Sequence, residues 1–431
     1  MITKYPAESR KPFIIITSNA WYFDEIGGAY KIATDFAIFC AQKGHDVHYI
    51  CASERIRGIE SAMEKGIKVW RYSKPMGIKK GGGVANLLTH LTQSRKIMVK
   101  IQQSIKHGNE IILNGHSALQ YLGAIHGLQN SVNCRKVLSV HSPLTEEYKA
   151  DKRYSRWSLF NQVKVAAFNY IEGSCYRRSD TIQCNSEFTR GVIEKNFPQD
   201  TKRGLVVCPG YVNRDQFSLI NLSRATARQK LQKSVWDTQD TIFFCLRRHV
   251  NRMGIDNLIR AAACVRKGSS AQKRSFRVII GGDGPLRAKM EELAAQMGLS
   301  GGVFFIGHVS EEELPYCYRA SDCFVLPTRA LECFGLIILE SFAVGTPVIA
   351  TPVGAIPEVL GPFAAASLTN GISAEDIAES ILKFLENKHS SESERKLYEY
   401  AKKFDKQSIL TRLEGIVTGK FGGVHSLGDR S

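Results

Sequence analysis

The 431-residue chain has no apolar run that approaches the roughly 20 residues needed to cross a bilayer. Residues 1–11 contain no apolar core of the kind found in a secretory signal, so we expect no such signal and a cytoplasmic protein. The eleven cysteines form no C-x-x-C pair and no regular pattern. Because zinc sites and disulfide frameworks depend on such spacing, the sequence favours scattered, reduced thiols.

Motifs of two large binding classes are also missing. Gly27 and Gly28, which follow the first apolar run, lack the G-x-G-x-x-G spacing of a nicotinamide site. No RNA-recognition, zinc-finger or helix-turn-helix signature accompanies the formal net charge of +17. Nucleic acid therefore has only the charge to support it as a partner.

That positive charge lies mainly in the first half of the chain. Residues 1–205 hold 30 Lys and Arg against 17 Asp and Glu, whereas residues 206–431 hold 28 against 24. Three interpretations stay open: nucleic-acid binding, contact with an anionic membrane surface or acidic acceptor, and a merely solvated face. The length itself predicts two domains of about 200 residues.

The first half alternates apolar strands with helical patterns, which predicts a doubly wound α/β domain. Residues 13–16 form a continuous apolar run that leads to Gly27, Gly28 and a helix. Glycines at a helix start let backbone N–H groups approach an anion, although many turns carry them only for the bend. His116 and His141 each follow another apolar run, at strand ends where open sheets bind ligands. The alternative for each is a structural loop histidine.

Three arginines follow the first apolar strand of the second half. Arg247, Arg248 and Arg252 come directly after residues 241–246. Crowding three guanidinium groups is costly without an anion between them, and arginine binds phosphate through paired hydrogen bonds. We interpret the cluster as an anion site, the alternative being solvent-exposed arginines.

Residues 329–340 combine two carboxylates with a helix start. The apolar run 323–326 predicts a buried strand, and Glu332 lies in the loop that follows it. Gly335 opens a helix in which Glu340 lies on a partly apolar face. A carboxylate there needs hydrogen-bond donors, which ligand hydroxyls would supply, and the helix start suits a phosphate. The alternative for each glutamate is a capping or solvated residue.

Glu332 and Glu340, with seven residues between them, resemble the paired glutamates of the family 4 retaining glycosyltransferases of the GT-B fold. The segments 343–350 and 353–358 fit the same family. The resemblance implies an α/β protein of GT-B type, in which two doubly wound Rossmann-like domains face a cleft.

We place the acceptor-side domain at residues 1–205 and the nucleotide-sugar domain at residues 206–397. A helix over residues 398–418 is expected to pack back on the first domain, as GT-B proteins often show. Residues 419–431 are expected to form a flexible tail.

The resemblance also implies roles for single residues. Glu332 would hold hydroxyls of the transferred sugar, Glu340 would hold the ribose, and His141 would contact the sugar from the first domain. The other predicted donor-binding residues are Gly28, Gly282, Val309, Phe334, Gly335 and Leu336, and the acceptor-side residues are Gly27 and His116.

The phosphate-binding positions depart from the family pattern. Arg248 stands at the family's arginine, but Met253 stands where the family has lysine. Because a thioether cannot bind phosphate, we expect Arg252 to supply the missing charge. The predicted catalytic set is His141, Glu332, Arg248 and Arg252.

The implied activity is retaining transfer of a sugar from a nucleoside-diphosphate donor, such as a UDP- or GDP-sugar, to an acceptor hydroxyl. No Asp-x-Asp occurs in the chain, so we expect the arginines and the helix dipole to replace a metal ion. No cofactor is expected beyond the nucleotide sugar itself. Small-molecule, saccharide and lipid acceptors stay open. The rivals are a GT-B sugar-nucleotide epimerase, a non-catalytic sugar-nucleotide-binding module and a nucleic-acid-binding protein.

Overall fold

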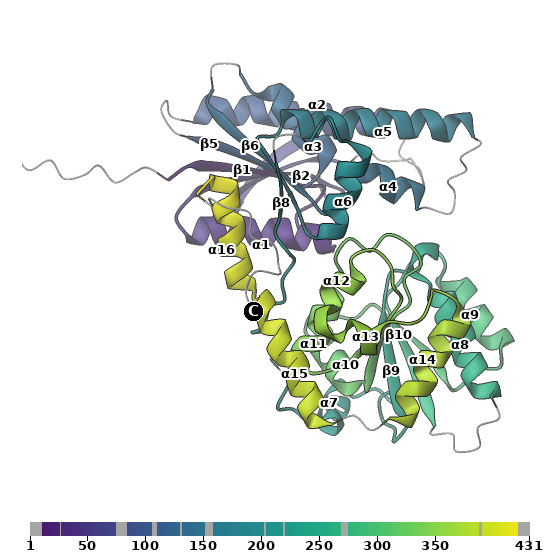
Figure 1. Cartoon of the computed structure of the whole chain (residues 1–431). Helices are drawn as coiled ribbons and strands as arrows, with labels where there is room; N and C mark the ends of the chain where they lie inside the picture. The colour runs from purple at the N-terminus through teal and green to yellow at the C-terminus, as the bar shows by residue number, and fades with distance from the viewer. Residues whose placement is uncertain are drawn as a thin grey trace, which may run out of the picture.

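The computed structural model describes most of the chain as two lobes, one above the other in Figure 1. The described residues are 11–25, 27–74, 84–105, 110–129, 132–150, 158–201, 204–218, 220–268, 275–387 and 390–420. Most of the tail predicted over residues 419–431 lies outside them. None of the described helices is both long and apolar enough to span a membrane.

Eight strands form the sheet of the first lobe, in the order β3-β4-β2-β1-β5-β6-β7-β8. Neighbouring strands are parallel except β3 and β4, which pair in antiparallel fashion. Apolar runs such as residues 13–16 form the centre because both faces of the sheet are covered by helices. The strands are β1 (Phe13–Thr17), β2 (Asp46–Ser53), β3 (Ile59–Glu64), β4 (Ile67–Ser73), β5 (Ile111–Gly115), β6 (Cys134–Val140), β7 (Thr181–Cys184) and β8 (Leu205–Val207).

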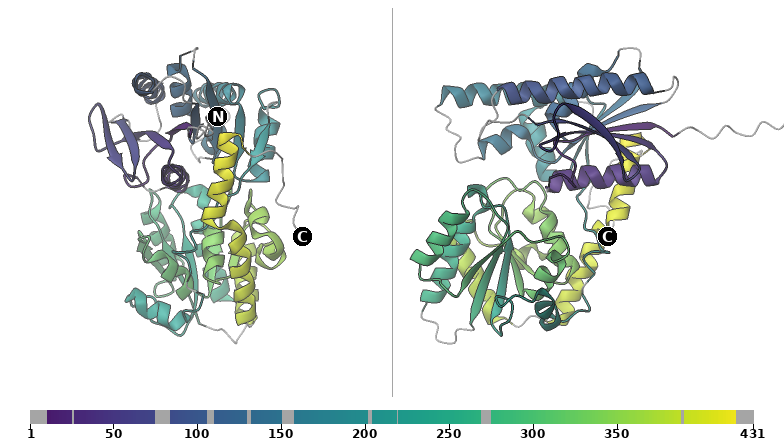
Figure 2. Two further views of the ribbon diagram at one scale, coloured as in Figure 1. Left: turned by 90° about the vertical axis from the view of Figure 1, so that its left-hand side faces the viewer. Right: turned by 180° about the vertical axis from the view of Figure 1, so that it is seen from behind.

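Helices cover both faces of this sheet. One face packs against α1 and α16, and the other packs against α2, α3 and α5, which lie along the outer side of the lobe in Figure 2. The bounds are α1 (Gly28–Gln42), α2 (Val84–Ser104), α3 (Ala118–Gly127), α4 (Leu144–Lys149), α5 (Leu159–Arg178), α6 (Glu187–Asn196) and α16 (Lys406–Thr418).

Five parallel strands form the second sheet, in the order β11-β10-β9-β12-β13. They are β9 (Thr241–Leu246), β10 (Phe276–Gly281), β11 (Val303–Gly307), β12 (Cys323–Leu326) and β13 (Val348–Ala350). One face packs against α8 (Ile255–Lys267), α9 (Arg287–Gln296) and α14 (Ala374–Glu386). The other packs against α7 (Arg224–Leu231), α10 (Leu314–Ala320), α11 (Leu336–Ala343), α12 (Ile356–Leu360) and α15 (Ser391–Ala401). The doubly wound arrangement predicted from the sequence is therefore confirmed in both lobes.

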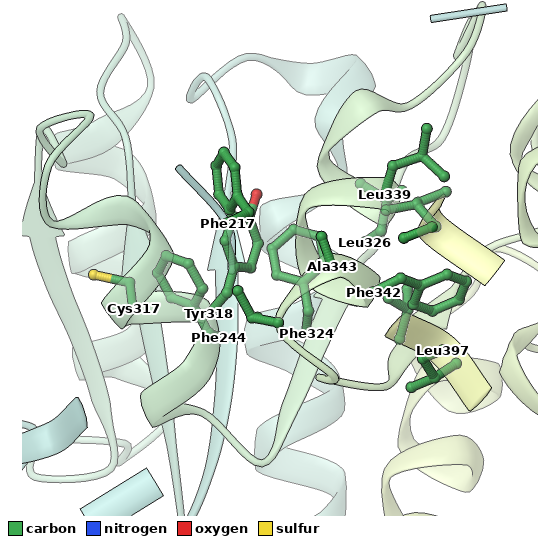
Figure 3. Close-up of a cluster of buried hydrophobic side chains, with 14 of the residues drawn as sticks. Phe217, Phe244, Cys317, Tyr318, Phe324, Leu326, Leu339, Phe342, Ala343 and Leu397 are labelled. Atoms are coloured by element: carbon green, nitrogen blue, oxygen red, sulfur yellow. The ribbon is translucent and has the colours of Figure 1, made fainter. Parts of the chain in front are cut away.

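An aromatic cluster holds α10 and α11 against the second sheet (Figure 3). The ring of Tyr318 on α10 meets Phe244 and Phe324 edge-on, at centroid distances of 5.6 and 5.1 Å. Because all three side chains are fully buried, the position of the Tyr318 hydroxyl is fixed by packing.

The helix predicted over residues 398–418 is two helices. A 3₁₀ turn follows α15, and Asp405 then caps α16 by accepting hydrogen bonds from two N–H groups of its first turn. Helix α15 packs on α11 in the second lobe, whereas α16 crosses to α1 and the first sheet (Figure 1). There Arg135 on β6 donates to the carbonyl of Val417, with 3.0 Å between Nε and the oxygen.

Candidate functional site

The start of α1 and the start of α11 meet between the lobes. Gly27 precedes α1 with an extended backbone, and a Cβ placed on Gly28 would lie 3.8 Å from Cδ1 of Leu336. One turn further along α1, Lys31 pairs with Glu311 of the second lobe, Nζ to Oε1 2.8 Å. The residues predicted from the two glycine-bearing helix starts are thus brought together.

Glu332 is held by Arg247, the residue directly after β9. Nη2 of Arg247 donates to Oε2 of Glu332 at 2.6 Å and to Oγ1 of Thr328 at 2.9 Å. The two charged side chains are only 9% and 15% exposed, so each charge depends on the other. Among the described residues no hydrogen bond reaches Oε1 of Glu332, which leaves that oxygen for a ligand hydroxyl.

The loop that carries Glu332 is supported on two sides. Leu331 has φ +55°, which is uncommon for a residue other than glycine, and Nη1 of Arg252 donates to its carbonyl at 3.0 Å. On the other side Ala355 N–H donates to the Glu332 carbonyl at 2.8 Å. A Cβ on Gly354 would lie 2.2 Å from that same oxygen. The position of the carboxylate is therefore set by its surroundings.

The other two predicted arginines interact with residues of the first lobe. Arg248 is exposed and forms no ion pair within the described part of the chain. Burial raises the pKa of Tyr30 on α1, and the charge of Arg248 opposes that rise from across the cleft. Nη2 of Arg252 lies 3.6 Å from Oε1 of Glu147 on α4. Arg252 thus lies between α4 and the Glu332 loop, and Arg248 lies within electrostatic reach of α1.

Gly335 connects this loop to α11 through a left-handed backbone with φ +93°, which glycine adopts without strain. The N–H groups of the first turn of α11 and the positive end of its dipole therefore face the same region. Phe334, which we also predicted to bind the donor, is buried and packs against Gly210 and Phe404. Its side chain belongs to the contact between the lobes.

Gly282 lies behind the Arg247 loop. With φ +100° it approaches so closely that a Cβ would lie 2.1 Å from the Arg247 carbonyl oxygen. Val309, half-buried after β11, packs beside Gly281. These two predicted donor residues thus flank the strand ends on the side away from Glu332.

Glu340 accepts a hydrogen bond from the Tyr318 hydroxyl, with 2.9 Å between the oxygens. Burial raises the pKa of Glu340, while the charge of Lys31 and the Tyr318 bond oppose the rise. Burial lowers the pKa of Lys31, and Glu340 works against that shift. We expected the Glu340 carboxylate to need hydrogen-bond donors, and the Tyr318 hydroxyl is one of them.

His116 and His141 are joined directly. Nδ1 of His116 lies 2.8 Å from Nε2 of His141, and the rings stack with centroids 5.0 Å apart. The other nitrogen of His116, Nε2, lies 2.8 Å from Oδ1 of Asn114. Burial lowers the pKa of His141 to about 4, and it lowers the pKa of His116 as well. Both rings are therefore neutral at physiological pH.

A cavity of about 180 Å³ opens beside the two histidines, at the ends of β5 and β6. Its lining includes Ser139 and Ser142, together with Glu147 on α4 and Glu172 on α5. The Glu172 carboxylate accepts hydrogen bonds from the N–H groups of Leu144 and Thr145, so it caps α4. The polar groups left to meet a ligand are thus chiefly hydroxyls, one carboxylate and neutral imidazoles.

Two protein-family models match the chain. Residues 26–212 match the model described as Glycosyltransferase Family 4, and residues 227–404 match the model described as Glycosyl transferases group 1. The two matches together take in nearly all of both lobes. The chain belongs to the family 4 glycosyltransferases. The family predicted from the sequence is confirmed.

Named relatives match this family 4 chain over about half of its length. One is the "GDP-mannose-dependent alpha-(1-6)-phosphatidylinositol monomannoside mannosyltransferase" of Mycobacterium tuberculosis, 29% identical over 53% of this chain and 57% of that protein. Another is the "D-inositol 3-phosphate glycosyltransferase" of Streptomyces scabiei, 30% identical over 43% of this chain and 42% of that protein. The matched part thus spans about half the length of these relatives.

Solved structures share the fold over almost the whole chain. The sucrose-phosphate synthase of Thermosynechococcus elongatus superposes with a TM-score of 0.74 at 19% identity, covering 95% of this chain and 99% of that one. Anabaena HepE, solved in complex with UDP and glucose, gives 0.69 at 15% identity, with 95% and 100% covered. At these identities the likeness concerns the fold, and it confirms the predicted GT-B architecture.

Sequence reasoning missed the contacts that lock the lobes of this family 4 chain together. Ser186, which caps α6 in the first lobe, donates to the carbonyl of Cys333 at 2.6 Å. Glu358 in the second lobe accepts hydrogen bonds from the N–H groups of Glu187 and Phe188, at 2.9 and 3.2 Å. Ser186 and Glu187 form a recognisable helix start in the sequence. The residues that they contact lie some 150 residues further along the chain, so the sequence does not pair them.

The Glu332 partner of Arg247 and the role of Asn114 were also missed. The sequence singled out Arg248 and Arg252, yet the guanidinium that binds Glu332 is that of Arg247. His116 was predicted to face the acceptor, but both of its ring nitrogens are engaged inside the protein. Within the described ranges, no group of three or more His, Cys, Asp or Glu side chains could hold a metal ion.

Proposed function

We propose that the protein transfers a sugar from a nucleoside-diphosphate donor to an acceptor hydroxyl. One observation carries the proposal: the start of α11 and Arg252 lie beside the fixed carboxylate of Glu332, and the exposed Arg248 follows Arg247, which binds that carboxylate. Positive groups and a helix start suit a diphosphate, and a carboxylate with a free oxygen suits sugar hydroxyls.

The diphosphate is the leaving group of this reaction, and negative charge grows on it as the glycosidic bond breaks. Arg248 has no ion-pair partner among the described residues, so it can turn toward a bound phosphate at little cost. Arg252 keeps one nitrogen on the Leu331 carbonyl and presents the other side of its guanidinium to the cleft. Together with the α11 N–H groups they stabilise the departing charge.

Glu332 acts on the sugar through the oxygen that Arg247 leaves free. Its other oxygen is fixed by the 2.6 Å bond to Nη2 of Arg247, so the carboxylate meets the sugar in one orientation. Glu340, with one oxygen on Tyr318, accepts a ribose hydroxyl through the other. His141 contacts the sugar from the first lobe.

We further propose that the anomeric configuration is retained and that no metal ion is required. NMR of the product formed in the first turnovers reads the configuration directly. Activity should persist after chelation with EDTA. Loss of activity that Mn²⁺ or Mg²⁺ restores would contradict metal independence.

The donor can be found by ligand-induced thermal stabilisation. One mycobacterial relative is named as GDP-mannose-dependent, and HepE was solved with UDP and with UDP-glucose, so GDP- and UDP-sugars lead the panel. A donor present at 100 times its Kd raises the stability by about 2.7 kcal/mol. The expected result is a clear shift with one nucleotide family, followed by transfer to a saccharide, small-molecule or lipid acceptor.

The same assay separates the rivals. An epimerised nucleotide sugar formed without acceptor identifies an epimerase, and binding with neither epimerisation nor transfer across the acceptor panel identifies a binding module. Binding of DNA or RNA that weakens steeply with salt, with no nucleotide-sugar binding, identifies a nucleic-acid-binding protein.

An anionic membrane surface is the proposed partner of helix α5. Leu159, Val163 and Tyr170 are 74%, 61% and 70% exposed and lie on one side of the helix, with Phe160 beside them under the Lys164 ammonium group. Exposed apolar side chains on the more basic half of a protein suit an anionic bilayer.

Vesicle co-sedimentation tests this surface. Leu159→Glu with Val163→Glu should reduce binding to anionic vesicles, whereas Leu382→Glu on α14 should not. Equal binding of both variants to the vesicles would contradict the proposed membrane contact of α5, and it would leave the proposed transferase activity unaffected.

A further inference from the structure

A continuous hydrogen-bonded chain runs from β5 to the cleft. It starts at Asn114 in β5, passes through both nitrogens of His116, and ends at Nε2 of His141 after β6. Asn114 and His116 are almost completely buried, and His141 lines the cavity beside them. Neither Asn114 nor the Asn114–His116 bond has a part in the function proposed above.

The orientation of the Asn114 amide is fixed by its second set of partners. Its Nδ2 lies 3.3 Å from the carbonyl oxygen of Val137 and 3.0 Å from Oγ of Ser139. A backbone carbonyl can only accept, so the amide nitrogen must lie on that side and Oδ1 must face His116.

This orientation sets the proton positions on both rings. Because Oδ1 of Asn114 only accepts, Nε2 of His116 must carry a hydrogen, and in a neutral ring Nδ1 is then an acceptor. The 2.8 Å contact therefore requires Nε2 of His141 to donate. The remaining nitrogen of His141, Nδ1, carries the lone pair. Burial keeps the pKa of both rings low, so the chain stays in this neutral form.

We propose that Asn114 and His116 are positioning residues that hold His141 in the Nε2–H form, so that its Nδ1 accepts a hydrogen bond from a substrate hydroxyl. The inference rests on the proposed function for the hydroxyl and on the hydrogen-bonded chain for the tautomer. The hydroxyl belongs either to the donor sugar or to the acceptor.

Several titratable groups lie around the pair. Apart from the two histidines themselves, the titratable residues in the cavity lining are Glu147, Glu172, Cys175 and Tyr176, all from α4 and α5. Glu172 is used by the N–H groups at the α4 start, and the Cys175 thiol donates to the Ala118 carbonyl. None of the described contacts links these groups to either imidazole ring, so the tautomer is governed from Asn114.

The tautomer can be read without any substrate. In ¹⁵N-histidine-labelled protein, protonated and bare ring nitrogens have well-separated nitrogen shifts, and His116→Gln and His141→Gln spectra assign the two rings. The expected result is the Nε2–H form for both rings at neutral pH. Protonation of His141 at Nδ1 would overturn the inference.

Asn114→Leu removes the anchor and keeps the volume. We expect Nδ1–H forms of both rings to become populated, and the KM of the substrate that carries the hydroxyl to rise about five- to tenfold, as for one lost hydrogen bond. Separate KM values for donor and acceptor identify that substrate. Ser139→Ala is the matched control for the tautomer alone, read from the ring nitrogen shifts, because it removes a hydrogen bond from the same amide but leaves Oδ1 on His116.

A second pair of variants keeps the test valid if Asn114→Leu folds poorly. Glutamine has one donor and one acceptor, so His116→Gln can relay the same polarity, whereas His116→Leu cannot. We expect His116→Gln to keep the His141 tautomer and most activity, and His116→Leu to lose both. Equal behaviour of the two would overturn the role of His116. Correct tautomers without transfer to any acceptor would instead count against the proposed function.

Discussion

The two sheets present opposite chemistry to the cleft. At the ends of β5 and β6 the polar groups are neutral: two histidines whose pKa burial lowers, locked to Asn114. At the ends of β9 and β12 they are charged: Arg247 on Glu332, with two further arginines beside them. This difference fits the proposal that one lobe binds hydroxyls through hydrogen-bond polarity, and the other binds the diphosphate through charge.

Among the changes to the charged side of the cleft, Glu332→Gln should have the largest effect on activity. The amide keeps a hydrogen bond to Arg247 but loses the charge that faces the sugar, so we expect kcat to fall about 10²–10³-fold. Glu394→Gln is a matched control, since Glu394 is 13% exposed and pairs with Arg319 at 2.8 Å, far from the cleft. Both variants should lower the thermal midpoint, but only Glu332→Gln should lower kcat by this factor. Equal activity in the two would contradict the assignment.

Replacing Arg248 and Arg252 one at a time distinguishes donor binding from structural support of the loop that carries Glu332. Arg248 makes no ion pair in the described residues, so Arg248→Ala should raise the donor KM about tenfold with an unchanged thermal midpoint. Arg252→Ala should raise the KM and also lower the midpoint, because Arg252 holds the carbonyl of the strained Leu331. Nucleotide titration by calorimetry and thermal unfolding measure the two effects. Identical profiles for both variants would argue against distinct roles.

The two neutral histidines should make the stability of the protein depend on pH in the acidic range. The pKa of His141 is lowered from 6.5 to about 4, so between these values the unfolded chain binds a proton that the folded one does not. The stability from this group is complete above pH 6.5 and is lost as the pH falls toward 4. His116→Gln combined with His141→Gln should therefore lose less stability than wild type over this window. Parallel curves of thermal midpoint against pH would contradict neutral burial.

The smallest effect on activity is expected from Glu358, which links the two lobes by hydrogen bonds. Glu358→Gln places an amide NH₂ group against one of the two N–H donors of Glu187 and Phe188. We expect KM values for both substrates to rise a few-fold with little change in kcat, because the lobes close less readily. Small-angle scattering should show a slightly larger radius of gyration. An unchanged radius together with unchanged KM values would exclude this closing role.

Much of the architecture could be predicted, because both sheets leave an alternating pattern of apolar strands and helices. Strand ends placed His116, His141 and Glu332 at the correct edges. The pattern did not show that Asp405 would end one helix and start another. It also did not separate Ile59–Glu64 as a strand of its own, since its residues are mostly exposed at the edge of the sheet.

Side-chain pairing was harder to predict than position. Neighbouring arginines after a strand differ in their surroundings, so the sequence cannot say that Arg247 binds Glu332 while Arg248 stays exposed. The bond between His116 and His141 depends on the register of β5 against β6, in which Gly115 lies opposite Leu138. That register is set by packing across the whole sheet, so no local pattern contains it.

Crystals grown with a nucleoside diphosphate would test the central claim most directly. We predict a diphosphate within hydrogen-bonding distance of Arg248 or Arg252 and of the first N–H groups of α11, with the free oxygen of Glu332 facing the position of the sugar. A diphosphate bound in the cavity beside His141, or away from both arginines, would contradict it.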